Sequence, residues 1–252
     1  MTEGGLEWKV IRLGEVDSTN TELKAMARDG ATEGTVLMAD SQTGGRGRLG
    51  RSWHSDGQWG LWASVLLRPK VEPERAPFLG MIMALAAARA VKSLSGLDAG
   101  IKWPNDVEVR GLKIAGILPE AGTGPSGLEW AVIGLGMNLM DPPSSFPEEL
   151  RGHASSIEAL GGAQISRDSA LKTVLDELAT LYSCFLAGGV KDIIGDISSI
   201  STVEGKRVTV ATEDGSYFAT ALKTEPSGAL SVIDDEGRLI TLLSGEVSIR
   251  RS

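Results

Sequence analysis

The stretch TVLMADSQTGGRGRLGRSWHSDGQWGLWASVLL, residues 35–67, joins two apolar runs through a loop rich in glycine and arginine. The runs Thr35–Ala39 and Trp59–Leu67 have the length and apolar content of strands, and Arg68-Pro69 ends the second. Because no helical pattern lies between them, the stretch predicts two strands that the loop connects.

The loop matches the spacing G-x-G-x-x-G at Gly45, Gly47 and Gly50, which is often associated with nucleotide binding. A dinucleotide-binding fold requires a helix directly after the glycines, but residues 51–57 read RSWHSDG and do not form one. A kinase glycine loop requires downstream signatures that the sequence lacks. A second match at residues 122–127 contains Pro125 and is expected in a hairpin turn. The spacing alone therefore does not identify the ligand.

Three arginines, Arg46, Arg48 and Arg51, distinguish this loop from an otherwise acidic chain. The 252 residues carry a net charge of −8, so the protein as a whole repels nucleic acid and anionic membranes. Arginine binds carboxylate and phosphate at two points, and glycine lets a backbone approach its ligand. The alternative is a solvated surface loop. We favour local anion binding by a loop that is mobile when empty and becomes ordered when an anion neutralises it.

Composition and missing motifs exclude several other classes of protein. Cys184 is the single cysteine, so an internal disulfide is excluded, and no apolar run reaches the roughly 18 residues that span a bilayer. The N-terminus, MTEGGLEWKV, lacks the regions of a signal peptide, which predicts a cytoplasmic protein without membrane association. The sequence has no Walker A motif, no Gly-x-Ser-x-Gly elbow and no Cys/His metal spacing.

The elements around the opening stretch predict an α+β fold. A strand at Trp8–Leu13 precedes helix-capping residues 17–20 and a helix at Thr21–Arg28. Further along we expect the helix Pro77–Leu94, the strands Ile101–Val109, Lys113–Leu118 and Trp130–Leu139, and the helices Arg167–Leu186 and Lys191–Ile197. Short turns between the consecutive strands predict a mixed, mainly antiparallel sheet packed with helices.

The pattern changes from about Lys206 onward to short alternating strands. These are expected at Arg207–Thr212, Tyr217–Leu222, Leu230–Ile233, Leu239–Leu242 and Glu246–Arg250, with glycine-containing turns between most of them. The pattern predicts a small C-terminal β-barrel, and hence two domains, residues 1–202 and 203–252.

Two further segments place lysines at strand ends. In Lys102-Trp103-Pro104-Asn105-Asp106, the lysine and the aspartate could hold phosphate and Mg²⁺, although Pro-Asn-Asp alone is more often just a turn. Lys113 begins the apolar run 113–118, and by itself this pattern favours a solvent-exposed strand end with Gly116 as a bulge.

Three motifs together closely resemble the catalytic signature of biotin protein ligases, also called biotin–acetyl-CoA-carboxylase ligases. They are QTGGRGRLGRSW at 42–53, KWPND at 102–106, and KIAGIL at 113–118 followed by Glu120. The resemblance extends to DSTN at 17–20, IGLGMN at 133–138 and GEVSIR at 245–250, so it covers nearly the whole chain. It implies a class II synthetase-like catalytic domain followed by an SH3-like barrel.

The resemblance also implies a two-step reaction. The carboxylate of biotin attacks the α-phosphorus of ATP to give biotinyl-5′-AMP and pyrophosphate. A lysine of a biotin carboxyl carrier protein then attacks the mixed anhydride. Because the reacting groups are both anionic, such a site needs preorganised cations where charge develops. Magnesium accompanies ATP in this reaction.

Residue roles follow from the same resemblance, which replaces the solvent-exposed interpretation of Lys113. Lys113 and Arg48 would be catalytic, and Asp106 would hold Mg²⁺. Biotin would be bound by Ser18, Thr19, Asn20, Gln42, Gly45, Arg46, Gly47, Arg48, Lys113 and Gly116. ATP and the adenylate would be bound by Arg48, Arg51, Trp53, Lys102, Asn105, Asp106 and Asn138.

Two alternative functions remain open at this point. A lipoate or octanoate ligase would share the fold but needs an apolar pocket, whereas Ser18, Thr19, Asn20 and Gln42 are polar. A non-catalytic biotin sensor would not require the phosphate-binding cations. The chain begins at the catalytic motifs without a helix-turn-helix, so we expect a single-function enzyme that does not bind DNA. A homodimer that pairs through the sheets is an open alternative to a monomer.

Overall fold

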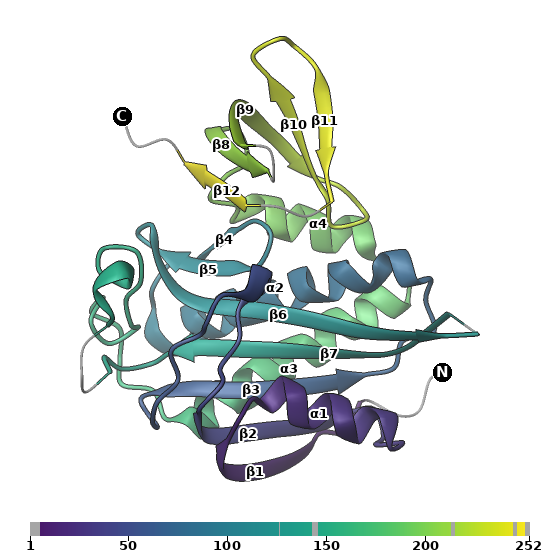
Figure 1. Ribbon diagram of the computed structural model, residues 1–252, viewed down its shortest axis with the longest axis vertical. Coiled ribbons are helices and arrows are strands. Elements are labelled where there is room, and N and C mark those ends of the chain that lie inside the picture. Colours follow the sequence, from purple (N-terminus) through teal and green to yellow (C-terminus); the bar gives the residue numbers. More distant parts are fainter. Residues whose placement is uncertain (1–5, 126, 143–145, 213–214, 244–245, 250–252) are drawn as a thin grey trace.

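A seven-stranded mixed sheet forms the main body of the protein, in the order β1-β2-β3-β7-β6-β5-β4. The computed structural model describes residues 6–125, 127–142, 146–212, 215–243 and 246–249. Figure 1 shows the strands side by side with the smaller C-terminal sheet beyond one edge. The predicted α+β fold class is confirmed.

The opening stretch forms two adjacent strands, β2 (Thr35–Gln42) and β3 (Gly60–Leu67), as predicted. They pair antiparallel, whereas β1 (Lys9–Val16) runs parallel to β2. The parallel pair requires a crossover, and α1 (Thr19–Arg28) supplies it. These pairings make the sheet mixed.

Alternation along β3 and β7 (Gly127–Asn138) gives the sheet two apolar faces. One face carries Leu37, Leu66 and Val132, which pack with Leu23 of α1. The opposite face contributes residues such as Val65 to the larger core, which contains α2 (Ala76–Ser95) and α3 (Arg167–Leu186). Because α1 is only 10 residues long, it covers part of its face and leaves the rest for a site.

The segment after α2 folds as antiparallel strands, with one difference from the prediction. The expected strand Ile101–Val109 is two strands, β4 (Gly100–Lys102) and β5 (Asp106–Val109), which pair through a turn at residues 103–105. The proline in this turn cannot donate a ladder hydrogen bond, which is a physical reason for the break. The strand β6 (Leu112–Gly124) then pairs with both β5 and β7.

The predicted hairpin turn at residues 122–127 connects β6 to β7, with Gly124 opposite Gly127. Its Ser126 lies outside the described residues. The strand β6 continues through Pro119, which sits opposite Ile133 in the ladder. A Cβ on Gly80 would lie 2.9 Å from the Pro119 ring, so glycine lets α2 pack closely on this strand.

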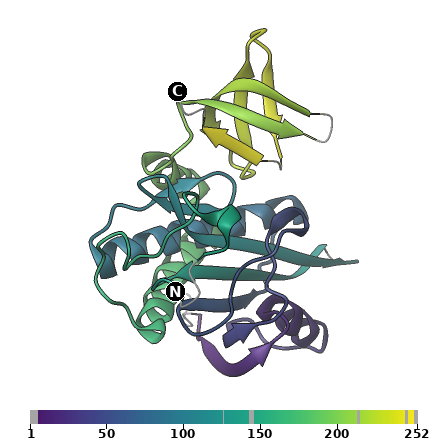
Figure 2. The ribbon, with the colours of Figure 1, turned by 60° about the vertical axis from the view of Figure 1, so that its left-hand side comes forward.

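The C-terminal part forms a five-stranded antiparallel sheet in the order β11-β10-β9-β8-β12. Its strands are β8 (Arg207–Thr212), β9 (Gly215–Thr224), β10 (Leu230–Asp234), β11 (Leu239–Leu242) and β12 (Glu246–Ile249). The short helix α4 (Val190–Ser199) leads into this sheet. Figure 2 shows the C-terminal sheet as a separate small body. Gly245 and Arg250, the first and last residues of the predicted closing motif, lie outside the described residues.

One helical segment, Pro73–Ser95, is long and apolar enough to cross a membrane by length and composition. The segment holds no uninterrupted apolar run of about 18 residues, because Arg89 and Lys92 interrupt it. The helix α2 is instead the central element of the core, and 72% of its most apolar window is buried inside the protein. Buried core helices commonly show this composition.

Candidate functional site

A cavity of about 430 Å³ opens on the α1 face of the sheet, between the start of α1 and the loop 42–53. The even-numbered residues of β7 explain its position. Trp130 and Val132 pack in the core under α1, but Gly134 and Gly136 follow on the same face. Since glycine adds no side chain, the sheet surface stays open beyond the helix, and all three predicted motifs contribute to the lining.

The polar floor of this cavity consists of the lining residues Ser18, Thr19, Asn20 and Gln42, together with Ser64, which is hydrogen-bonded to Thr19 behind the lining. The first three lie at the start of α1 and are at most 4% exposed. Ser64 comes from β3 and is fully buried. The side chains of Thr19, Asn20, Gln42 and Ser64 form one hydrogen-bonded cluster of uncharged groups.

Gln42 connects β2 to the start of α1. Its Oε1 accepts the Thr19 backbone N–H at 2.9 Å, and its Nε2 donates to Ser55 Oγ at 3.1 Å. Ser18 occupies the N-cap position without a side-chain capping bond. The prediction that residues 17–20 cap their own helix is therefore wrong for Ser18, because an acceptor from a neighbouring strand satisfies the helix N–H.

Asn20 is held from both ends of its amide. Its Nδ2 donates to the Leu118 carbonyl at 3.1 Å and to Glu120 Oε2 at 2.8 Å. Its Oδ1 accepts from Ser64 Oγ at 2.6 Å. A Cβ on Gly134 would lie 2.5 Å from Asn20 Oδ1, so glycine makes room for this arrangement.

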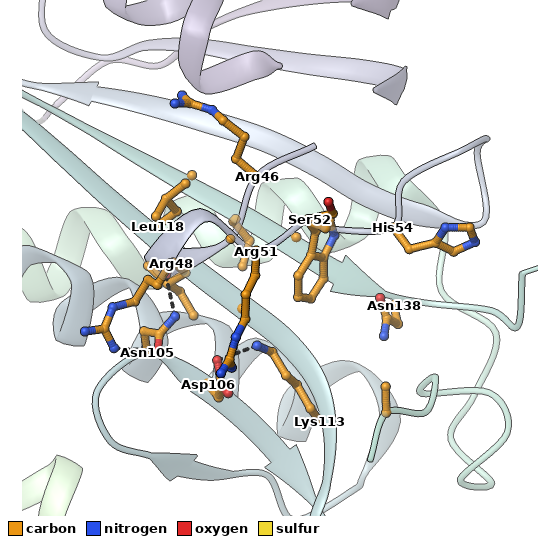
Figure 3. Close-up of a pocket in the computed structure, with 18 of the residues that line it drawn as sticks. Arg46, Arg48, Arg51, Ser52, His54, Asn105, Asp106, Lys113, Leu118 and Asn138 are labelled. Atoms are coloured by element: carbon orange, nitrogen blue, oxygen red, sulfur yellow. Dashed lines mark hydrogen bonds and ion pairs between the residues drawn. The ribbon is translucent and has the colours of Figure 1, made fainter. Parts of the chain in front are cut away.

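The cationic wall is formed by Arg48, Arg51, Lys102 and Lys113, which line the same cavity. Figure 3 shows Arg51 and Lys113 directed toward Asp106. Lys113 Nζ lies 2.6 Å from Asp106 Oδ1 and over the Trp53 ring, 5.2 Å from its centroid. The structure therefore brings the predicted lysines and these loop arginines to one shared cavity.

The turn between β4 and β5 supports this wall. Arg48 Nη1 donates to Asn105 Oδ1 at 3.3 Å, and Asn105 Nδ2 donates to the Ile117 carbonyl at 2.9 Å. Lys102 Nζ lies 3.5 Å from Glu108, a carboxylate that is only 7% exposed. Neighbouring carboxylates thus balance both lysines, although the wall remains rich in cations.

Trp53 covers the two glycines at the centre of the site. A Cβ on Gly116 would lie 2.8 Å from its ring, and a Cβ on Gly136 would overlap the ring. The Trp53 Nε1 atom is buried and has no hydrogen-bond partner. Gly116 was expected to let the backbone approach biotin, and in this structure it accommodates the indole.

The loop of residues 45–53 folds back on itself as a narrow hairpin. The Gly45 carbonyl accepts the Trp53 N–H at 2.8 Å, and the Arg51 carbonyl accepts the Gly47 N–H at 2.7 Å. A Cβ on Gly45 would approach Ser55 Oγ to 2.5 Å. Arg46 differs from the other arginines, because it points away from the wall and pairs with Glu120 at 2.9 Å.

Asn138 was predicted as a nucleotide-binding residue, and it lines the cavity. Its Nδ2 donates to the Ser155 carbonyl at 2.9 Å.

Several other lining residues could not be found from the motifs. The segment that includes Phe146, Glu149, Leu150, His153 and Ala154 also lines the cavity, as does Val247 of β12. A short parallel bridge between Lys113 and Ala154 places this segment beside the wall. No sequence pattern indicates that bridge, because its partners are far apart in the chain.

Comparison with known proteins places this site in a class. The model of the biotin/lipoate A/B protein ligase family matches residues 13–138. The biotin--[acetyl-CoA-carboxylase] ligase of Mycobacterium tuberculosis is 32% identical over 251 residues, which cover 97% of this chain and 88% of that relative. The bifunctional ligase/repressor BirA of Bacillus subtilis is 32% identical over 88% of this chain and 68% of its own length.

Solved structures agree with the sequence relatives. The biotin protein ligase from Aquifex aeolicus in complex with biotin and ATP superposes with a TM-score of 0.82 at 32% identity. The match covers 97% of this chain and 99% of that chain. The protein therefore belongs to the biotin/lipoate A/B protein ligase family. Within that family the predicted class of enzyme, a biotin ligase, is confirmed.

Proposed function

We propose that this enzyme activates biotin as biotinyl-5′-AMP and then transfers biotin to a lysine of a biotin carboxyl carrier protein. One observation carries the proposal: an uncharged polar floor and a cationic wall meet in a single cavity. The floor offers hydrogen bonds to a neutral head group, and the wall offers charge to anions.

The polar floor is proposed to bind the ureido ring. Thr19, Asn20 and Gln42 present amide and hydroxyl groups that the protein already holds in place. Such preorganisation lowers the entropic cost of binding a small polar ring. An octanoyl chain offers no donor or acceptor to these polar groups, which disfavours the lipoate and octanoate alternative.

The cationic wall is proposed to perform the first chemical step. Biotin's carboxylate and the triphosphate of ATP repel each other, so Lys113 and Arg48 would neutralise them and stabilise charge on the phosphoryl oxygens. Lys102, Arg51 and Asn105 would hold the phosphates. A pure biotin sensor has no need of this wall, which favours catalysis over sensing.

Trp53 and Asn138 are proposed to contact the nucleotide. Trp53 lines the cavity at the junction between floor and wall. Asn138 is 3% exposed and lines the same cavity. The flat indole also offers a stacking surface for an adenine ring.

Magnesium fits the site as an ion delivered with the phosphates. Asp106 faces the cavity with its side chain 21% exposed, and its Oδ1 pairs with Lys113 at 2.6 Å. Among the described residues no group of three or more potential metal ligands occurs. Mg²⁺ usually needs one or two carboxylates and substrate phosphates, so Asp106 is a sufficient protein ligand. The ion would neutralise phosphate charge.

Biotin-dependent exchange between ATP and pyrophosphate tests this proposal. Purified enzyme should catalyse exchange with biotin and not with lipoate or octanoate, and Lys113→Ala should lower the exchange rate by about 10²- to 10³-fold. Biotin transfer to an isolated carrier domain tests the second step. Exchange with octanoate alone, or biotin binding without any exchange, contradicts the proposal. The cytoplasmic location, homodimer formation and lack of DNA binding stay predictions.

A further inference from the structure

Glu120 receives donors from two separate parts of the fold. Its Oε1 lies 2.5 Å from Lys24 Nζ, and its Oε2 accepts from Asn20 Nδ2 at 2.8 Å and from Arg46 Nη2 at 2.9 Å. Asn20 and Lys24 are one turn apart on α1 and so share a face of that helix. Arg46 belongs to the loop of residues 45–53, called the glycine-arginine loop below. One carboxylate on β6 therefore joins the helix to the loop.

The position of Glu120 separates its role from direct ligand binding. Among the described residues, those that line the large cavity include Asn20 and Arg46 but not Glu120. Glu120 follows Leu118 by two positions on β6, so it faces the same side of the sheet just beyond the cavity edge. A substitution at Glu120 thus removes no side chain from the cavity itself.

The charges around Glu120 favour its ionised form. Partial burial raises the pKa of this carboxyl, but hydrogen bonds from Lys24 and Asn20, together with the charges of Lys24 and Arg46, outweigh burial and hold the pKa below its ordinary value. The side chains of Glu120 and Lys24 are 25% and 17% exposed. A charge-assisted cluster of this kind is stronger than an isolated surface pair.

We propose that Glu120 is a positioning residue that clasps the glycine-arginine loop to β6 through Arg46 and orients the Asn20 amide at the polar floor. The clasp keeps the loop over the cavity, so it slows the release of bound biotin. Arg46 lines the cavity and was predicted to bind biotin, and in this proposal it acts through its contact with Glu120. The biotin readout rests on the proposed function, whereas the loop readout below does not.

Glu120→Gln is the informative variant. Glutamine keeps the shape and can still accept the Asn20 hydrogen bond, but it loses the charge that holds Arg46. The matched control is Asp98→Asn, which removes one charge from the exposed ion pair of Lys92 and Asp98 at 2.6 Å, beyond the end of α2. Both variants change a carboxylate to an amide of the same size.

Limited trypsin digestion without ligand measures loop opening, because the loop carries Arg46, Arg48 and Arg51 as cleavage sites. Glu120→Gln should speed cleavage after Arg48 and Arg51 about fivefold, while Asp98→Asn should match the wild type. Biotin dissociation followed by stopped flow should accelerate by about the same factor. The exchange rate at saturating biotin and ATP should stay close to the wild-type rate, because chemistry at the wall is untouched.

A double-mutant cycle with Arg46→Gln distinguishes a clasp from general loosening. The double variant should release biotin no faster than Glu120→Gln alone, because that variant has already lost the contact with Arg46. Additive effects, unchanged loop cleavage, or faster cleavage throughout the chain would overturn the proposal. If Glu120→Gln does not fold, Arg46→Gln alone tests the clasp by the same measurements of loop cleavage and biotin release. Failure of biotin to bind the wild type would contradict the proposed function and leave the trypsin result to decide the clasp.

Discussion

The polar floor and the cationic wall lie in one cavity but are built differently. Floor residues such as Thr19, Asn20 and Ser64 are buried, uncharged and hydrogen-bonded to one another. Wall residues are longer, more exposed and balanced by carboxylates, as Lys113 is by Asp106 at side-chain exposures of 30% and 21%. A neutral hydrogen-bonding surface fits the polar head group of a ligand, whereas a charged surface stabilises the negative charge that develops during a reaction.

The largest expected effect comes from the wall. Lys113→Ala should lower the rate of biotin-dependent exchange by about 10²- to 10³-fold, because it removes one preorganised cation from the developing charge. Biotin affinity, measured by calorimetry, should change much less. Lys92→Ala, at the exposed pair with Asp98, is the control. A loss of affinity as large as the loss of rate would erase the proposed distinction between wall and floor.

The junction between the two regions should give the next largest effect. Gly136→Ala places a methyl group in the volume of the Trp53 ring and must displace it. Overpacking of this kind costs about 1–3 kcal/mol, so the KM for ATP should rise roughly tenfold to a hundredfold. Gly14→Ala, where a Cβ meets nothing within 4 Å, is the control. Unchanged tryptophan fluorescence and KM would show that the indole does not fix the nucleotide position.

The floor should respond through affinity. Ser64→Ala removes a buried donor to Asn20 Oδ1 and leaves that oxygen without this partner, which costs about 1–3 kcal/mol. The KM for biotin should therefore rise about tenfold, while kcat and the KM for ATP stay near their wild-type values. A fall in kcat with an unchanged KM for biotin would place Ser64 in the chemistry instead. Steady-state kinetics with each substrate varied distinguish these results.

The smallest expected effect concerns pH. Because the folded-state pKa of Glu120 is lowered, its contribution to the free energy of unfolding is present above the ordinary value of 4.5 and is lost as the pH falls through the folded-state pKa. Chemical denaturation should show a difference in the free energy of unfolding between wild type and Glu120→Gln above about pH 4.5. This difference should shrink as the pH falls below that value. A difference that does not depend on pH would contradict this linkage.

The elements and the charged motifs were predictable because their signals are local. The helix α3 has the predicted bounds, and the strands β2 and β3 lie where the apolar runs placed them. The positive charge of the glycine-arginine loop was evident from its arginines. Resemblance to a family then indicated which motifs act together. For Lys113, the local pattern alone had favoured a solvent-exposed strand end.

The remaining features depend on contacts between distant residues. Ser64 reads as an ordinary strand residue until β3 places it under α1. Glu120 accepts from Arg46 across 74 positions and from Asn20 across 100, and a shift of one residue in the β6 register would turn it to the other face. By itself the sequence determined the elements and the kinds of chemical groups available. Only the tertiary structure decided which groups meet, because strand register and helix placement bring distant side chains within hydrogen-bonding distance.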